Sequence, residues 1–402
     1  MWSSIHGAWV VCSELGKRTK SSGIKIILAT AAGVGISSIT FAAECVVGGN
    51  GTIAINQNTV ASCTLSSIAP EIGNSSPYNT GFLVYSNGGV ARSIIVENDL
   101  TTILKGVNGI SVYATAPYSA SSTFDASGKI INLTMADVDY AGMPPTATSY
   151  ARIGAGVSYG GTLSVGTLNL NMPDLPAGTN RDTRFEHYGV LTGSYKDSGE
   201  NNTSNGLYSK ALFDNLNIAM NSSNNTGLLY GSYPLLAGIR VIQGAGLNTN
   251  VGQGSAGYVE VNDNLDLNLV GTTNDVIGIY ISGSSQQNAD GEEIFPEVHL
   301  NNSKIKVVST SSRANAIRLG KDAAVGTGEG RLYSTGHMEI DTTEAKNSNA
   351  IDIIWQGAIL DANADTSSTE IKAGKQAIRI SGNASQDTDQ TRTEFNNLVI
   401  KK

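Results

Sequence analysis

A serine in a glycine-rich stretch offers the first candidate for chemistry. Residues 156–160 read Gly-Val-Ser-Tyr-Gly, so Ser158 matches a Gly-x-Ser-x-Gly motif. That motif activates its serine only on a sharp turn from a strand into a helix, with a histidine and an acid nearby. Residues 161–170 instead continue in a strand pattern, and none of His187, His299 and His337 lies in a triad-like context. We therefore interpret Ser158 as part of a turn.

Pairs of aspartates offer a second kind of chemistry. Asp137 with Asp139, or Asp263 with Asp266, could supply the two carboxylates that cleave a glycosidic bond as acid and base. Acids spaced in this way along a strand more often form its solvent-exposed face. We therefore expect no catalytic residue, and polysaccharide cleavage is kept as an alternative hypothesis.

The segment 361–370 resembles the start of a calcium-binding loop. Its possible oxygen ligands stand at alternate positions and are Asp361, Asn363, Asp365 and Ser367. An EF-hand loop also needs a glycine at its sixth position and a glutamate at its last. Thr366 and Lys372 stand there instead, so we expect a polar loop and no metal site. No glycine-rich stretch has the Lys-Ser/Thr of a phosphate loop, so we expect no cofactor.

A short step recurs through the second half of the chain, from Ala237 to Lys402. Each copy is a small residue followed by an apolar, a variable and an apolar residue. Self-similarity at a period of tens of residues is typical of solenoids, and alternation within each copy predicts a strand. We expect the small residue to allow close approach of the backbone at a corner. The central isoleucines should form one file and are Ile239, Ile279, Ile317, Ile351 and Ile378.

Each repeat is too short to bury its apolar face alone. Stacked on the next, it would add to a continuous inner column, with neighbouring turns joined by backbone hydrogen bonds. A propeller blade has a similar period but needs four strands, whereas we count about two in each repeat. The sequence therefore predicts an all-β parallel β-helix over residues 76–402, with weaker register before residue 236.

The composition suits many short strands joined by polar turns. The 402 residues include 46 glycines and 9 prolines, and 15% of them are charged. This modest charge is that of a folded chain, and the length is sufficient for a large core. The formal net charge of −8 makes nucleic acid and anionic membrane surfaces poor partners.

The N-terminal segment predicts export. Lys25 precedes an apolar run of about 14 residues that ends in small side chains, the pattern of a secretory signal peptide. The run is shorter than the roughly 20 residues that a spanning helix needs. Thr40 and Ala42 place small residues at −3 and −1, so we expect cleavage after Ala42, with Ala43 as the second choice. A buried helix is the alternative.

Residues 2–23 precede this signal and carry a second charged region. Their core reads Trp2, then Gly7-Ala-Trp9-Val-Val, then Ser13-Glu14-Leu15, followed by a basic Lys/Ser stretch. This pattern resembles the extended signal peptide region of type V secreted proteins, the autotransporters and two-partner exoproteins of Gram-negative bacteria. That family usually has a few more residues before the first Trp, so the resemblance implies that Met1 is a misplaced start. Residues 1–42 would then be a removable extended signal peptide.

Cys45 and Cys63 are the only cysteines after the expected signal. An exported pair is most simply a disulfide, which here would close a loop of about 18 residues, worth about 3 kcal/mol in the chain-entropy model. A metal site is disfavoured because no histidine lies near, and two free thiols are the remaining alternative. We assign residues 43–75 to a β cap, because a solenoid needs its first open edge covered.

The resemblance to autotransporters also implies a function. In that family the passenger is a right-handed parallel β-helix that crosses the outer membrane through its own C-terminal barrel. It works at the cell surface, commonly in adhesion, aggregation and virulence. The resemblance therefore implies a non-enzymatic adhesin that passes through the Sec and outer-membrane assembly machinery. Its partners would be a surface receptor, glycan or protein, or further copies of itself, contacted through variable loops and open strand edges.

The last residues, 393–402, follow the strand pattern of another turn, and no part of the sequence has the alternating strands and aromatic girdles of a membrane barrel. We therefore expect a truncated passenger. The cell surface is the location of the intact family, and the periplasm would be that of the shorter chain. Two further hypotheses remain, a β-helical polysaccharide-degrading enzyme and a two-partner exoprotein. The second is weakened because we find no Asn-Pro-rich N-terminal module.

Overall fold

The computed structural model divides the chain into two compact units, Met1–Phe41 and Ala42–Lys402. In the first unit, β1 (Trp2–Ser3) pairs antiparallel with β2 (Ala8–Trp9). The expected signal run, Ala42, Asp137 and Asp139 lie outside the described residues. Within the described part, no helix is long and apolar enough to cross a membrane. The structure describes residues 2–3, 8–9, 43–48, 52–55, 61–73, 80–86, 89–114, 121–136, 150–174, 185–193, 207–223, 235–243, 255–272, 275–283, 286–288, 290–311, 313–320, 329–354, 357–381 and 391–401.

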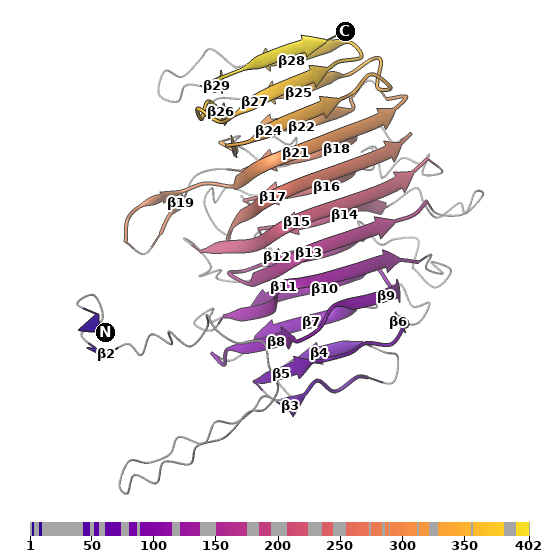
Figure 1. Cartoon of the computed structure of the whole chain (residues 1–402), viewed down its shortest axis with the longest axis vertical. Coiled ribbons are helices and arrows are strands. Elements are labelled where there is room, and N and C mark those ends of the chain that lie inside the picture. The colour runs from indigo at the N-terminus through magenta and orange to yellow at the C-terminus, as the bar shows by residue number, and fades with distance from the viewer. Residues whose placement is uncertain are drawn as a thin grey trace, which may run out of the picture. The chain divides into compact units, whose positions relative to one another are not determined.

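The described part of the second unit consists of strands joined by turns, and its two large sheets are parallel throughout (Figure 1). We call the ten-stranded sheet the first face. Its strands follow sequence order and are β4 (Ile53–Ile55), β7 (Thr80–Ser86), β10 (Asn108–Ala114), β12 (Tyr150–Ser158), β14 (Phe185–Thr192), β16 (Leu235–Ile242), β18 (Asp275–Ser282), β22 (Asn315–Gly320), β25 (Asn349–Ile354) and β28 (Gln376–Ser381).

The sixteen-stranded sheet bends along its length. Its long strands are β11 (Ser122–Met135), β13 (Thr162–Met172), β15 (Tyr208–Ser222), β17 (Ala256–Gly271) and β21 (Glu297–Ser309). The first half of β11 pairs with β8 (Arg92–Val96) and its second half with β9 (Leu100–Lys105), and the register shifts between Ala126 and Ile130. We call the two sides of this bend the second and the third face.

Shorter strands complete these two faces at both ends. The second face also contains β3 (Ala43–Glu44), β5 (Ser62–Leu65), β8, β23 (Arg331–Ser334), β26 (Ile359–Ala362) and β29 (Arg392–Phe395). The third face also contains β6 (Glu71–Gly73), β9, β24 (His337–Asp341), β27 (Ser368–Lys372) and β30 (Leu398–Lys401). The chain visits the three faces in turn, which is the arrangement of a parallel β-helix or solenoid. The expected all-β fold with parallel strands is confirmed.

The five isoleucines of the repeated step form one file, as the sequence predicts. Ile239 pairs in register with Ile279, Ile279 with Ile317, Ile317 with Ile351, and Ile351 with Ile378. The same file continues toward the N-terminus through Val190, Ala155, Ile110, Phe82 and Ile53. Apart from Ile378 in the last turn, every member is fully buried. One apolar column therefore runs through all ten strands of the first face.

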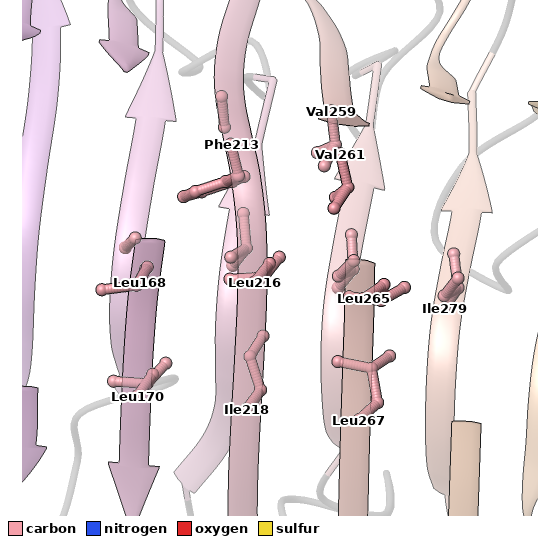
Figure 2. Packing of buried hydrophobic residues seen from close by; sticks show 14 of the residues in the cluster. Leu168, Leu170, Phe213, Leu216, Ile218, Val259, Val261, Leu265, Leu267 and Ile279 are labelled. Atoms are coloured by element: carbon pink, nitrogen blue, oxygen red, sulfur yellow. The ribbon is translucent and has the colours of Figure 1, made fainter. Parts of the chain in front are cut away.

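The other faces add their own files to this core. Leu168, Leu216 and Leu265 occupy equivalent positions in successive turns, and Figure 2 shows them side by side. Leu170, Ile218 and Leu267 form the next file along the third face. Because side chains alternate along a strand, each face sends every second residue into this shared interior.

The small residue before each isoleucine is required by a close approach between turns. A Cβ at Gly238 would lie 2.8 Å from the carbonyl oxygen of Gly278, and one at Gly278 would lie 2.4 Å from that of Ala316. The same Cβ at Gly278 would also lie 2.7 Å from the side chain of Ile305 on the third face. The predicted close approach is therefore present, but Gly238 and Gly278 lie within strands β16 and β18, whereas the sequence predicts a corner.

The described part of residues 43–75 supplies the first strands of all three faces. Strands β4, β5 and β6 pair with β7, β8 and β9, so this segment is continuous with the stack. Cys45 and Cys63 form a disulfide with a Cα–Cα distance of 4.9 Å, and both are buried in the core. The amide of Cys45 also donates to the carbonyl oxygen of Thr64 at 2.7 Å. The disulfide therefore fastens β3 over the first turn.

Candidate ligand-binding surface

Aromatic rings gather on the outer side of the second face. They come from successive strands β15, β17, β21 and β23. His299 and Tyr333 pair in register, whereas Tyr208 and Tyr258 each lie two residues before the residue that pairs with the next ring. Tyr208 and Tyr258 have ring centroids 5.4 Å apart, Tyr258 and His299 5.0 Å, and His299 and Tyr333 4.7 Å. All four side chains are half-buried. We call Tyr208, Tyr258, His299 and Tyr333 the aromatic ladder.

Carboxylates accept hydrogen bonds within this ladder. The hydroxyl of Tyr258 donates to Glu260 Oε2 at 2.9 Å, and Nε2 of His299 lies 2.9 Å from Glu297 Oε2. Burial, and then the Glu297 carboxylate, raise the pKa of Tyr208 to about 12. Burial, followed by the hydrogen bond to Glu260, also raises the pKa of Tyr258. Both phenols are therefore neutral at physiological pH and keep their protons for hydrogen bonding.

Cations and a hairpin border the ladder. Lys210 Nζ lies 5.9 Å from the ring centroids of both Tyr208 and Tyr258. The guanidinium of Arg331 lies 3.1 Å from the ring centroid of Phe295, whose amide donates to the hydroxyl of Tyr208 at 3.4 Å. Phe295 follows a two-stranded antiparallel hairpin made of β19 (Gln286–Gln287) and β20 (Glu293–Ile294).

This hairpin is an insertion between the first and second faces of one turn. Figure 1 shows it projecting from the stack beside the start of β21. Ile294 and Phe295 are buried at its base, which fixes the hairpin to the second face. The ladder is therefore bounded on one side by a projecting element.

The side chains of this surface are of kinds that can contact a binding partner. Tyrosine, histidine and arginine offer a large apolar contact area together with a polar tip, and such residues dominate the energetics of protein interfaces. Glu260 and Glu297 add acceptors, and Lys210 and Arg331 add donors. A partner with apolar surface and hydroxyl or amide groups would satisfy all of them.

The chain matches no protein-family model, no curated protein and no solved structure. The comparisons therefore assign the chain to no family, and the resemblance to autotransporters, which comes from residues 2–23 and the repeated strand step, stays an expectation. The surface has to be interpreted from its own geometry.

Ser158, which we interpret from the sequence as part of a turn, stands where β12 turns into β13. Ser158 ends β12, and its carbonyl oxygen accepts a hydrogen bond from Gly161 at 3.1 Å. Tyr159 and Gly160 have φ values of 52° and 83°, after which the chain enters β13. This is a connection from strand to strand, whereas the serine motif needs one from strand to helix.

The candidate acids do not gather at one place. Asp263 and Asp266 are both exposed, the first at the bend of β17 and the second on the third face. Asp361 accepts from the amide of Asn363 at 3.1 Å and lies 3.4 Å from Nη2 of Arg392, so its two oxygens serve a turn and an ion pair. Among the described residues, no group of three or more His, Cys, Asp or Glu side chains could hold a metal ion.

The third face carries a shallow groove of about 520 Å³ with an amide ladder along it. Asn217 donates to Asn169 at 2.7 Å, Asn169 donates to Asn132 at 2.7 Å, and Asn132 donates to Thr101 at 2.9 Å. These side chains satisfy one another across successive turns. The amide ladder therefore stabilises the stacking of successive turns.

Proposed function

We propose that this chain is the exported passenger of an autotransporter, a right-handed parallel β-helix that acts at the cell surface as a non-enzymatic adhesin. The single observation that supports adhesion is the aromatic ladder on the second face. The extended signal pattern in residues 2–23 supports export, and the disulfide between Cys45 and Cys63 is compatible with an oxidising compartment. The boundary between the two compact units lies between Phe41 and Ala42, one residue before the expected cleavage site.

The aromatic ladder suits adhesion for a physical reason. A solenoid presents a long surface that its core holds rigid, so side chains on one face lose little further freedom on binding. Half-buried tyrosines are already partly fixed by their neighbours. They would contribute contact area at low entropic cost, while Lys210, Arg331 and the two glutamates would set the orientation of the receptor.

Adhesion can be measured with beads coated with the full chain. We expect such beads to bind host or bacterial cell layers, or one another, better than uncoated beads do. The double variant Tyr258→Ala and Tyr333→Ala should lose most of this binding. The matched control is Tyr85→Ala with Tyr113→Ala, a stacked tyrosine pair of the first face with ring centroids 4.8 Å apart. Equal binding by coated and uncoated beads would contradict the adhesive function. Equal loss of binding in both double variants would contradict a specific role of the aromatic ladder.

Polysaccharide cleavage is a second candidate function, favoured by one observation. Glu260 accepts a hydrogen bond from the Tyr258 hydroxyl at 2.9 Å, and Glu297 pairs in register with Tyr258 on the next strand, so two carboxylates belong to the surroundings of one ring. Paired carboxylates are the usual machinery of glycoside hydrolysis. The full chain would be incubated with neutral and acidic polysaccharides, and new reducing ends would be measured. Products that vanish in Glu260→Gln and Glu297→Gln would establish an enzyme, whereas no product from any substrate would favour adhesion.

A further inference from the structure

A small pocket lies on the outer side of the first face, in the turns of β22, β25 and β28, which are the last three labelled on this face in Figure 1. Its volume is about 190 Å³. Four cationic side chains line it, namely Arg313, Arg318, Lys375 and Arg379, together with the carboxylate of Asp352. The clustering is unexpected in a chain whose formal net charge is −8.

The positive charges of this pocket exceed its negative charges. Arg379 makes two hydrogen bonds of 2.6 Å to the two oxygens of Asp352, a bidentate pair. Arg313 lies 2.8 Å from a carboxylate oxygen of Asp275, which does not itself line the pocket. Arg318 lies 3.8 Å from the same oxygen, and Lys375 makes no ion pair with any described residue. Two carboxylates thus face four cations, which leaves a surplus of two positive charges.

Arg318 is held in place before any ligand arrives. Its guanidinium lies 5.3 Å from the ring centroid of Tyr280, and the guanidinium of Arg240 lies 3.7 Å from the same centroid. Only 14% of the Arg318 side chain is exposed, and its buried Nε has no hydrogen-bond partner among the described residues. A planar donor fixed in this way matches the two oxygens of an oxyanion and loses little freedom on binding one.

Neutral amides stand beside these charges. Asn315, Asn349 and Gln376 come from β22, β25 and β28 and line the same pocket. Asn315 donates its amide to the backbone oxygen of Asn349 at 2.8 Å, which leaves the Asn315 side-chain oxygen as an acceptor. Amides both donate and accept, so they suit the hydroxyl groups of a sugar. A fully ionised inorganic anion could accept from their N–H groups but could not donate to their oxygens.

We propose that this pocket binds an acidic sugar residue of a glycan, with its carboxylate or sulfate held by Arg318 and Lys375. Asn349 and Gln376 bind the adjoining hydroxyls. The site lies on the first face, away from the strands that carry the aromatic ladder, so it is a second binding site and does not rest on the adhesive role of that ladder.

Calorimetric titration of the full chain tests this assignment. The ligands are a short oligogalacturonate, its methyl ester, in which the carboxylates are neutral, a sulfated oligosaccharide of similar length, and inorganic sulfate. We expect the oligogalacturonate or the sulfated oligosaccharide to bind, and the tighter of the two identifies the anionic group. The methyl ester and inorganic sulfate should each bind at least about tenfold more weakly. Equal affinity for the methyl ester would overturn the charge recognition, and equal affinity for inorganic sulfate would overturn the assignment to a sugar.

Three variants locate the binding. Lys375→Gln and Arg318→Gln should each weaken it by about tenfold or more, the range of one charged hydrogen bond. Lys304→Gln is the matched control, because it removes one exposed cation from the third face. Loss of binding in Lys304→Gln to the same degree would show attraction by general charge and overturn the site, as would unchanged binding in both pocket variants. Tyr258→Ala should leave the titration unchanged, which separates this result from any failure of the adhesive proposal.

Discussion

Ile353 and Ile380 occupy the same position in adjacent turns, yet only one of them is covered. They pair in register between β25 and β28. Ile353 is fully buried, whereas 54% of Ile380 is exposed. The two side chains are chemically identical, and they differ only in how much water folding removes from them.

Truncation at these two positions should therefore give unequal losses of stability. Ile353→Ala removes buried atoms and leaves a cavity, so we expect the free energy of unfolding to fall by about 2–5 kcal/mol. Ile380→Ala is the matched control and should cost less than about 1 kcal/mol, because much of its side chain already faces water. Urea denaturation followed by circular dichroism measures both. Similar losses in the two variants would contradict the stacked core.

The close approach of the backbone at Gly278 gives a second prediction. Gly278→Ala would place a Cβ 2.4 Å from a backbone oxygen of the next turn, so we expect a loss of about 1–3 kcal/mol from overpacking. Gly156→Ala on the same face is the control, because its added Cβ would meet nothing closer than 3.4 Å. That change should stay within about 0.5 kcal/mol of the parent. The same denaturation assay applies, and a Gly278→Ala variant as stable as Gly156→Ala would argue against the close approach.

Acid should destabilise the protein through His187. This side chain is fully buried, and burial, followed by the charge of Arg152, lowers its pKa from 6.5 to about 3. The unfolded chain binds a proton there near pH 6.5. Between these values the unfolded state carries more protons, so the free energy of unfolding falls as the pH decreases from about 6.5 to about 3.

Removing this imidazole should flatten the pH dependence. In His187→Leu we expect the slope of unfolding free energy against pH to decrease by up to about 1.4 kcal/mol per pH unit over that window. In the parent protein, NMR should show that the His187 ring stays neutral on acidification to about pH 4. A ring that titrates close to its ordinary pKa would refute the assignment.

Export makes a prediction about the N-terminus. When the full chain is produced in a Gram-negative host, N-terminal sequencing of the exported form should begin at Ala43, or at Glu44 if the second site is used. A variant with Ala42→Arg and Ala43→Arg should not be cleaved, because a large charged residue replaces the small one required at −1. An exported chain that keeps Trp2 would rule out the removable signal.

The core file could be predicted from sequence because two local signals coincide at each copy. Alternating apolar residues mark a strand, and a small residue before the isoleucine marks a close approach between turns. The signal weakens toward the N-terminus because Ala155, Val190 and Phe82 fill the same file with side chains of different size. The core accommodates side chains of these different sizes, but a search of the sequence for one repeated residue pattern does not detect them.

The aromatic ladder could not be predicted in the same way. The connections from the first to the second face differ in length from turn to turn, so Tyr258, His299 and Tyr333 stand at no constant spacing from the isoleucines. Tyr208 and Tyr258 also lie two residues out of register with the next ring of the ladder, which hides the correspondence further. The sequence predicts contacts on loops and strand edges, which stays a prediction, and the ladder that we propose lies on the outer surface of strands. The basic pocket was missed for a related reason, because Arg318 and Lys375 come from different turns.

The β19–β20 hairpin shows that a connection can be lengthened without changing the pairing of the core strands. It adds residues between β18 and β21, yet Val298 still pairs with Val259 before it and Leu332 after it. The cost of closing a longer loop grows only slowly with its length. New sequence can therefore be grafted at such a connection, one turn at a time, while the scaffold keeps its hydrogen bonds. The sequence of the exposed connections can therefore vary without loss of the strand pairing and core packing that stabilise the fold.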